Sequence, residues 1–257
     1  MKDIPQFIQN KSIEIQEKPF RHVIIDNFFE PGFYADLSKE FNKLLDMGLS
    51  DNPMEKSIFH RFKKYDAYSK MINPKWDYPF NFFYSSDWDS YLAGIFGIQS
   101  SKDTIANLHH HAVGSEDGWT HNDYSLCSFK EDRLPNGINP WFHQCIYEDS
   151  SPDRQPDTLK RMRSVVMMIY LCNDPNWKEG DGGETGLYRE NNRESLVEKV
   201  APINNRFFAF EISPYSYHGF LKNIKSPRNT IIQWLHEEPS NKYKKFGFYK
   251  PVAWTGY

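Results

Sequence analysis

The chain is poor in cysteine, in long apolar runs and in net charge, and each shortage excludes a class of protein. Its three cysteines, Cys127, Cys145 and Cys172, have no CxxC spacing, so neither a disulfide framework nor a zinc knuckle is expected. A reducing compartment fits this usage. The N-terminus lacks an apolar secretory signal, and no run approaches the ~20 apolar residues that span a bilayer. We therefore expect a cytoplasmic protein without a membrane partner.

The charge balance limits the binding partners that can be expected, and the aromatic content indicates the fold class. The 257 residues include 31 basic and 34 acidic side chains, a net charge of −3, which predicts no broad basic surface for nucleic acid. Aromatic residues make up 16% of the chain, and such residues favour strands and pocket walls. All-β barrels and sandwiches of this length are common as single domains. The oligomeric state is left open.

The patterning places helices before strands. Residues 21–29 are expected to form an opening strand, residues 31–45 a helix with one apolar face, and residues 87–96 a second helix capped by Asp87. Further strands are expected at 104–111, 164–171, 206–212 and 229–235, with weaker ones near Leu187 and Val200. Strands without regular intervening helices predict a mainly β fold. We expect a double-stranded β-helix (jelly-roll) core with the N-terminal helices packed on its outer face.

One domain is expected to span residues 1–257. Its parts are a strand and supporting helices (1–103), the jelly-roll core (104–236) with an insert (124–162), and a C-terminal extension (237–257). The stretch from Lys130 to Lys160 is polar and carries aromatic residues, Trp141 among them. A connection of this length in a compact domain is usually a lid or a binding loop, and a solvated surface excursion is the alternative.

Three separated residues form a candidate metal site. On a strand, His121 and Asp123 would project from the same face. Alone, this His-x-Asp is close to a chance event in a chain with nine histidines, and a surface hydrogen-bonding pair is the alternative. His218 follows an alternating strand and a turn, where a core histidine is equally plausible by itself. Two His and one Asp can occupy one face of an iron octahedron and leave the other face open.

Arg228 strengthens this interpretation. It opens an apolar strand on which Arg228, Thr230, Ile232 and Trp234 share one face. A guanidinium on an apolar face is costly unless an anion meets it, and a carboxylate matches its fork geometry. The alternative is a salt bridge with a protein carboxylate at the edge of the barrel. An arginine ten residues after the second histidine instead suits the far carboxylate of a bound keto acid.

Together these residues resemble the Fe(II)/2-oxoglutarate-dependent dioxygenases, particularly their prolyl 4-hydroxylase-like branch. Besides the metal motif, the resemblance covers Arg163, the strand ending Tyr170-Leu171-Cys172-Asn173, Trp177 and Asp181-Gly182-Gly183-Glu184, in order. It runs from about residue 105 to 236. The opening strand is also similar to one common in that branch.

The resemblance implies roles for individual residues. The iron ligands would be His121, Asp123 and His218. The 2-oxoglutarate site would comprise Arg228 and Tyr170 on the far carboxylate, with Trp234, Thr230 and His111 beside the cofactor. Arg163 and Trp141 are assigned to the substrate. Where many members have a tyrosine before the first iron ligand, this sequence has His109-His110-His111, which also raises the alternative of an extra metal site.

The implied cofactors are Fe(II), 2-oxoglutarate as co-substrate, and dioxygen. The presence of Asp123 favours hydroxylation, because halogenating relatives lack this carboxylate. Three hypotheses follow: a prolyl 4-hydroxylase-like enzyme acting on a peptide or protein, a hydroxylase of a free amino acid or sugar derivative, and a cupin-like metal-binding module without catalysis. The triad together with Arg228 argues against the third. The first is the leading prediction, and an open groove or a closed pocket beside the iron would separate it from the second.

Overall fold

Strands dominate the chain after its first hundred residues, and helices lie mainly before them. The computed structural model describes residues 4–9, 12–62, 64–140 and 158–252. The strands are β1 (His22–Ile25), β2 (Leu49–Ser50), β3 (Phe59–Arg61), β4 (Tyr68–Met71), β5 (Thr104–His111), β6 (Leu126–Lys130), β7 (Thr158–Tyr170), β8 (Thr185–Tyr188), β9 (Leu196–Val200), β10 (Phe207–Glu211), β11 (Tyr217–Phe220) and β12 (Arg228–Glu237). The helices are α1 (Pro31–Asp46), α2 (Ser86–Phe96) and α3 (Pro239–Phe246), and short 3-10 turns lie at Ile4–Gln6, Phe80–Tyr84 and Arg193–Ser195.

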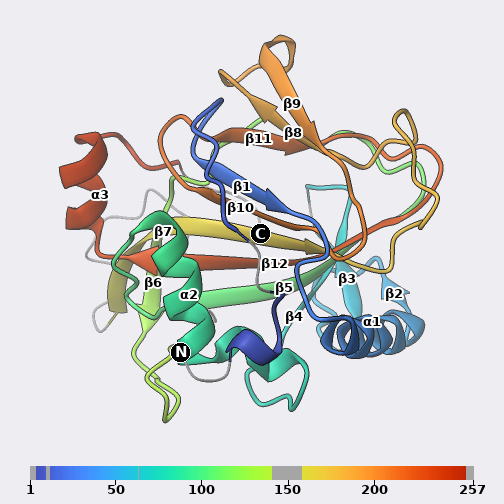
Figure 1. The fold of residues 1–257 in the computed structure, drawn as a ribbon, viewed down its shortest axis with the longest axis horizontal. Coiled ribbons are helices and arrows are strands. Elements are labelled where there is room, and N and C mark those ends of the chain that lie inside the picture. The colour runs from blue at the N-terminus through green and yellow to red at the C-terminus, as the bar shows by residue number, and fades with distance from the viewer. Residues whose placement is uncertain (1–3, 10–11, 63, 141–157, 253–257) are drawn as a thin grey trace.

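The strands form two sheets (Figure 1). The larger sheet has the order β1-β10-β7-β12-β5-β4-β3-β2, with β6 also paired to β7, and the smaller has the order β11-β8-β9. These pairings are antiparallel except for β2 with β3. Helices α1 and α2 lie on one side of the larger sheet and the smaller sheet lies on the other (Figure 1). The predicted mainly β, double-stranded β-helix fold with N-terminal helices outside it is therefore confirmed.

Alternation along β7 divides the interior into two cores. Val165, Met167 and Ile169 belong to the apolar cluster that also holds the buried faces of α1 and α2. Val166 and Met168 point the other way, into a cluster between the two sheets. Because both faces of the strand are buried, its sequence reads as one continuous apolar run instead of an alternating one.

The helix ends follow local chemistry. Pro31 occupies the first turn of α1, where its missing N–H is no loss. Ser85, not the predicted Asp87, caps α2: its hydroxyl accepts a hydrogen bond from the backbone N–H of Trp88 at 3.2 Å. Asp87 lies in the first turn instead, where a negative charge also favours the helix dipole. Gly97 ends the helix with a left-handed φ of 67°.

Several predicted boundaries were wrong. The opening strand ends at Ile25 because Asn27 has a left-handed φ of 50°, which turns the chain. The two ends of the predicted insert, 124–162, form β6 and the start of β7, which pair with each other. Trp141 and the rest of 141–157 lie outside the described residues. The short strands β2, β3, β4, β6 and β11 and the helix α3 had not been predicted.

No helix within the described ranges combines the length and the apolar character needed to cross a membrane.

Candidate active site

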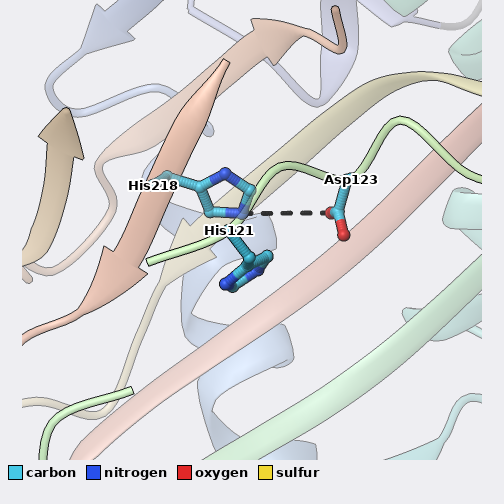
Figure 2. Close-up of side chains that lie close together, drawn as sticks. All are labelled: His121, Asp123 and His218. Carbon is cyan, nitrogen blue, oxygen red and sulfur yellow. Dashed lines mark ion pairs between the residues drawn. The ribbon is translucent and has the colours of Figure 1, made fainter. Parts of the chain in front are cut away.

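His121, Asp123 and His218 converge on the side of the larger sheet that faces β8 and β11 (Figure 2). Their ligand atoms all lie within 4.8 Å of one another, and His218 Nε2 is 3.9 Å from Asp123 Oδ2. His218 lies on β11, but His121 and Asp123 do not lie on a regular strand as predicted. Instead His121 forms an isolated bridge with His218, in which the two residues exchange backbone hydrogen bonds of 3.0 and 2.8 Å.

Backbone carbonyls orient both imidazoles. The Nδ1 atoms of His121 and His218 lie 2.9 Å from the carbonyl oxygen of Trp119 and 3.1 Å from that of Ser216. A carbonyl only accepts, so each ring carries its proton on Nδ1 and its lone pair on Nε2. This is the tautomer that a metal-binding histidine needs. Asn122, between the ligands, points away and donates to the Pro214 carbonyl at 2.9 Å.

Two further side chains hold the Asp123 carboxylate. Arg163 Nη1 donates to Oδ1 and Trp234 Nε1 donates to Oδ2, each at 2.7 Å. The guanidinium carbon of Arg163 also lies 4.5 Å from the centre of the Trp234 ring, a cation–π contact. The structure thus places both residues directly behind a candidate metal ligand. From sequence, Arg163 had been assigned to the substrate and Trp234 to the cofactor, and those roles stay predictions.

Burial and charge set the protonation states of the site. Burial, followed by the charge of His218, lowers the pKa of His121 to about 3, and burial also lowers the pKa of His218. Burial alone would raise the pKa of Asp123. The charges of Arg163, His218 and His121 and the hydrogen bond from Trp234 outweigh that effect and lower it to about 2. At neutral pH the site therefore presents two neutral imidazoles and one carboxylate, the protonation state that metal binding requires.

This donor set fits Fe(II). Two imidazoles and a carboxylate on one side of the site match the facial triad of non-haem iron oxygenases. Among the described residues, these three form the single cluster of at least three possible metal ligands. The His109–His111 run does not make a second site there, because strand parity separates its rings. His110 points to the opposite face, where its Nδ1 lies 2.7 Å from Asn229 Oδ1.

Arg228 supplies a cation without a protein anion. It is 4% exposed, and its Nη2 donates to Thr185 Oγ1 at 3.1 Å, while the Tyr170 hydroxyl lies 2.8 Å from the same oxygen. Within the described ranges it forms no ion pair with a carboxylate, and its Nε is buried without a hydrogen-bond partner. The protein salt bridge considered from sequence is therefore not found there. A buried guanidinium is strongly disfavoured without an anion, so this position fits a ligand carboxylate.

The remaining predicted cofactor residues surround Arg228. Strand register pairs Arg228 with His111 and Thr230 with His109. The His111 ring stacks on Phe220, with centroids 3.8 Å apart, and the Thr230 hydroxyl oxygen is buried without a partner. Tyr170 is fully buried and reaches the site through Thr185. Thr185 was missed from sequence, although its place directly after Asp181-Gly182-Gly183-Glu184 was a usable signal.

Steric constraints explain the two glycines in the Asp181-Gly182-Gly183-Glu184 motif. Gly182 has a φ of 82°, and a Cβ on it would lie 2.2 Å from the Lys222 carbonyl oxygen. Gly183 has a φ of 85°, and a Cβ there would lie 3.5 Å from Arg228 Cβ. Glycine adopts such angles readily, and only glycine allows so close a backbone approach at the first position. The motif thus allows the loop before β8 to pack closely against the segment that precedes Arg228.

A cavity of about 700 Å³ joins the metal ligands to Arg228 and extends beyond both over β5, β4 and β3. Its lining includes Arg163, Trp234, His109, Asn107, Ser69 and His60. Metal ligands, a cation and further polar side chains therefore open into one space. Its volume exceeds what a small dicarboxylate needs, so a second molecule can be bound beside it.

Comparison with known proteins agrees with this geometry. Residues 142–236 match the model of the 2OG-Fe(II) oxygenase superfamily, a range that includes His218 and Arg228 but begins after Asp123. A prolyl-4-hydroxylase from Pseudomonas putida superposes with a TM-score of 0.54 at 14% identity, over 84% of this chain and 92% of that one. At this identity the likeness concerns the fold.

Two other solved structures are similar at lower scores. A viral collagen prolyl hydroxylase from Paramecium Bursaria Chlorella virus-1, in a 2OG complex, has a TM-score of 0.49 at 14% identity, over 84% of this chain and 94% of that one. A prolyl hydroxylase from Trichoplax adhaerens, in complex with a hypoxia inducible factor peptide fragment, has a TM-score of 0.48 at 17% identity, over 83% and 82%. Because both scores are below 0.5, the fold comparison rests on the Pseudomonas putida enzyme.

We predict that the metal-free protein loses stability as the pH falls below about 6.5. Burial lowers the folded-state pKa of His109 and of His121 to about 3, from an ordinary value of 6.5. The unfolded chain therefore binds protons first, and each such histidine removes about 1.4 kcal/mol of unfolding free energy per pH unit inside that window. Urea midpoints measured in a chelator between about pH 7.5 and pH 5 test this. A midpoint independent of pH would contradict it, and His109→Phe should reduce the slope.

A second prediction concerns the support of Asp123. Trp234→Phe removes the hydrogen bond to Oδ2 and should weaken metal binding about 10-fold in an anaerobic Fe(II) titration. Trp88→Phe is the matched control, because Trp88 Nε1 donates at 2.8 Å to Gln233, the neighbouring residue on the opposite face of β12. That variant should lose about 1 kcal/mol of stability and keep its metal affinity. Equal metal affinity in the two variants would show that Trp234 does not act through Asp123.

Proposed function

We propose that this chain, an Fe(II)- and 2-oxoglutarate-dependent dioxygenase with a prolyl 4-hydroxylase-like fold, hydroxylates an aliphatic C–H of a prolyl or other residue in a peptide or protein. His121, Asp123 and His218 hold the iron, and Arg228 binds the far carboxylate of 2-oxoglutarate. The bound iron and 2-oxoglutarate supply the oxidising chemistry: one oxygen atom of O₂ enters the C–H bond and the other enters succinate, with release of CO₂.

The protein residues fix the charge and the orientation of this site. Arg163 and Trp234 occupy one oxygen each of Asp123, which keeps the carboxylate ionised and limits its rotation. Thr185 accepts from Arg228 and so aims the guanidinium. The carbonyls behind His121 and His218 keep both Nε2 atoms unprotonated. Together these contacts orient the ligands before any substrate enters.

The observation that favours a peptide or protein is the rim of the cavity. Two large apolar side chains that line it are exposed, Met54 at 74% and Trp119 at 42%. Methionine and tryptophan are enriched where proteins contact one another, and here one of each lies beside the binding site. A substrate that extends out of the cavity would cover both. The shared fold of the Pseudomonas putida prolyl-4-hydroxylase also supports this assignment.

A free small molecule, such as an amino acid or sugar derivative, is the second candidate. The cavity volume of about 700 Å³ lies within the range of ordinary small-molecule sites, and this observation favours it. A lid formed by the Lys130–Lys160 segment would favour the small molecule over the peptide. Most of this segment lies outside the described residues, so it does not decide between these two substrates. Its described parts, 130–140 and 158–160, do not line the cavity.

Succinate formation with Fe(II) and 2-oxoglutarate, measured across peptide and metabolite panels, tests the proposal. We expect stimulation by peptides, together with a substrate mass increase of one oxygen atom. Arg228→Ala should raise the KM for 2-oxoglutarate about 100-fold, because a charged hydrogen bond is lost, while Fe(II) affinity changes much less. Stimulation by metabolites alone would contradict the peptide assignment. Equal loss of iron and 2-oxoglutarate binding would contradict the role of Arg228.

A further inference from the structure

A row of polar side chains crosses the floor of the cavity. Register pairs Thr230 on β12 with His109 on β5, His109 with Ser69 on β4, and Ser69 with His60 on β3. Directly paired residues project from the same face of a sheet, and neighbouring strands lie about 4.8 Å apart. Asn107, two residues before His109, points the same way. The floor therefore carries polar groups at regular intervals away from the cofactor site.

Three of these side chains have no hydrogen-bond partner among the residues that the structure describes. Ser69, Asn107 and His109 make no side-chain hydrogen bond with any other described residue, although Ser69 is 5% exposed and His109 is 7% exposed. Nε2 of His109 is fully buried. Buried polar groups without partners are uncommon because each one costs free energy. Ser69 and His109 are buried, Asn107 is half-buried, and all three line one cavity floor, which indicates a ligand that supplies the missing hydrogen bonds.

The row lies next to the metal site. The Trp234 ring, whose Nε1 donates to Asp123, has its centre 6.5 Å from that of the His109 ring. One aromatic ring thus separates the metal ligand from the polar floor. Phe62 packs edge-on against His109 from the other side, with centroids 5.3 Å apart. A molecule on this floor would therefore lie between Phe62 and the Trp234 ring, next to the candidate metal ligand.

The three floor side chains are uncharged, and the cations beside them on β3, β4 and the preceding segment have hydrogen-bond partners within the protein. Burial lowers the pKa of His109 to about 3, so the ring is neutral in the physiological range. Arg61 is bound to Asp66 at 2.5 Å, and Lys70 donates to the Lys56 carbonyl at 3.3 Å. Lys56 Nζ lies 3.0 Å from His60 Nε2. Ser69, Asn107 and His109 themselves carry no charge, so these three side chains do not select an anion.

We propose that Ser69, Asn107 and His109 form the subsite that positions the primary substrate, and that they recognise uncharged amide groups of a peptide main chain. A hydroxyl, a carboxamide and a neutral imidazole each both donate and accept, which matches the N–H and C=O groups of a peptide. The proposal rests on the proposed function, because it assumes that the primary substrate binds beside the iron. Uncharged hydroxyl or amide groups of a metabolite would present the same chemistry, so the experiment separates the two sources.

The probes are N-acetylated tripeptide amides with varied neutral central residues, the corresponding single capped amino acids, and neutral polyols. Succinate formation gives the KM of each probe for the wild type and for Ser69→Ala and Asn107→Ala. We expect tripeptides to stimulate best and each variant to raise their KM about 5- to 10-fold, as the loss of one hydrogen bond predicts. The KM for 2-oxoglutarate should change less than about twofold, since that site lies around Arg228.

Met71→Leu is the matched control, because Met71 pairs with Asn107 across the same floor but offers no strong hydrogen bond. It should change the KM of the tripeptide less than about twofold. N-methylation of one peptide amide should lower wild-type kcat/KM and have no further effect in the variant that lacks its partner. Ser69→Ala should keep its thermal midpoint, because the hydroxyl has no hydrogen bond to any described residue to lose.

Each outcome decides between the proposals. Variants with wild-type KM values, or a KM rise that follows a fall in thermal midpoint, would overturn the subsite. Stimulation by single amino acids or polyols but not by tripeptides would overturn the peptide substrate, and the same two variants would then test whether the floor binds those molecules. No stimulation of the wild type by any probe would overturn both.

Discussion

The site depends on how one buried carboxylate is held. Asp123 is 4% exposed, and an isolated charge there would be strongly disfavoured. Arg163 from β7 and Trp234 from β12 each bind one of its oxygens. These two central strands of the larger sheet thereby position a ligand that comes from an irregular segment. The bridge between His121 and His218 attaches that segment to the smaller sheet. The metal site therefore requires both sheets to be in place.

The two buried arginines, Arg163 and Arg228, have different partners in the cavity. Arg163 neutralises a protein carboxylate and leaves the metal ligand ionised. Arg228 has no such partner in the described part of the chain, so its charge is available to a ligand. A single substitution can thus weaken either metal binding or keto-acid binding. Ser69, Asn107 and His109, which have no hydrogen-bond partner among the described residues, are proposed to be available to the primary substrate in the same way.

Much of this site could be predicted from the sequence, because its signals are local. Spacing and type suggested His121, Asp123 and His218, and strand parity placed Arg228 on the same face as Thr230 and Trp234. What could not be predicted depends on register between distant strands. The contact between Arg163 and Asp123 joins residues 40 apart in sequence, and the residues that flank them contain no pattern from which the contact could be predicted. Ser69 is paired with His109 only because β4 adds to the edge of β5. Short strands such as β4 have no periodic signal long enough to recognise.

The central claim is that one Fe(II) ion is held by His121, Asp123 and His218 while Arg228 binds 2-oxoglutarate. A crystal structure of the anaerobic complex with Fe(II) and 2-oxoglutarate tests it most directly. We predict a single iron bound by Nε2 of both histidines and by a carboxylate oxygen of Asp123, with the far carboxylate of 2-oxoglutarate against the Arg228 guanidinium. Iron bound by other residues, or a 2-oxoglutarate carboxylate that does not contact Arg228, would contradict the account.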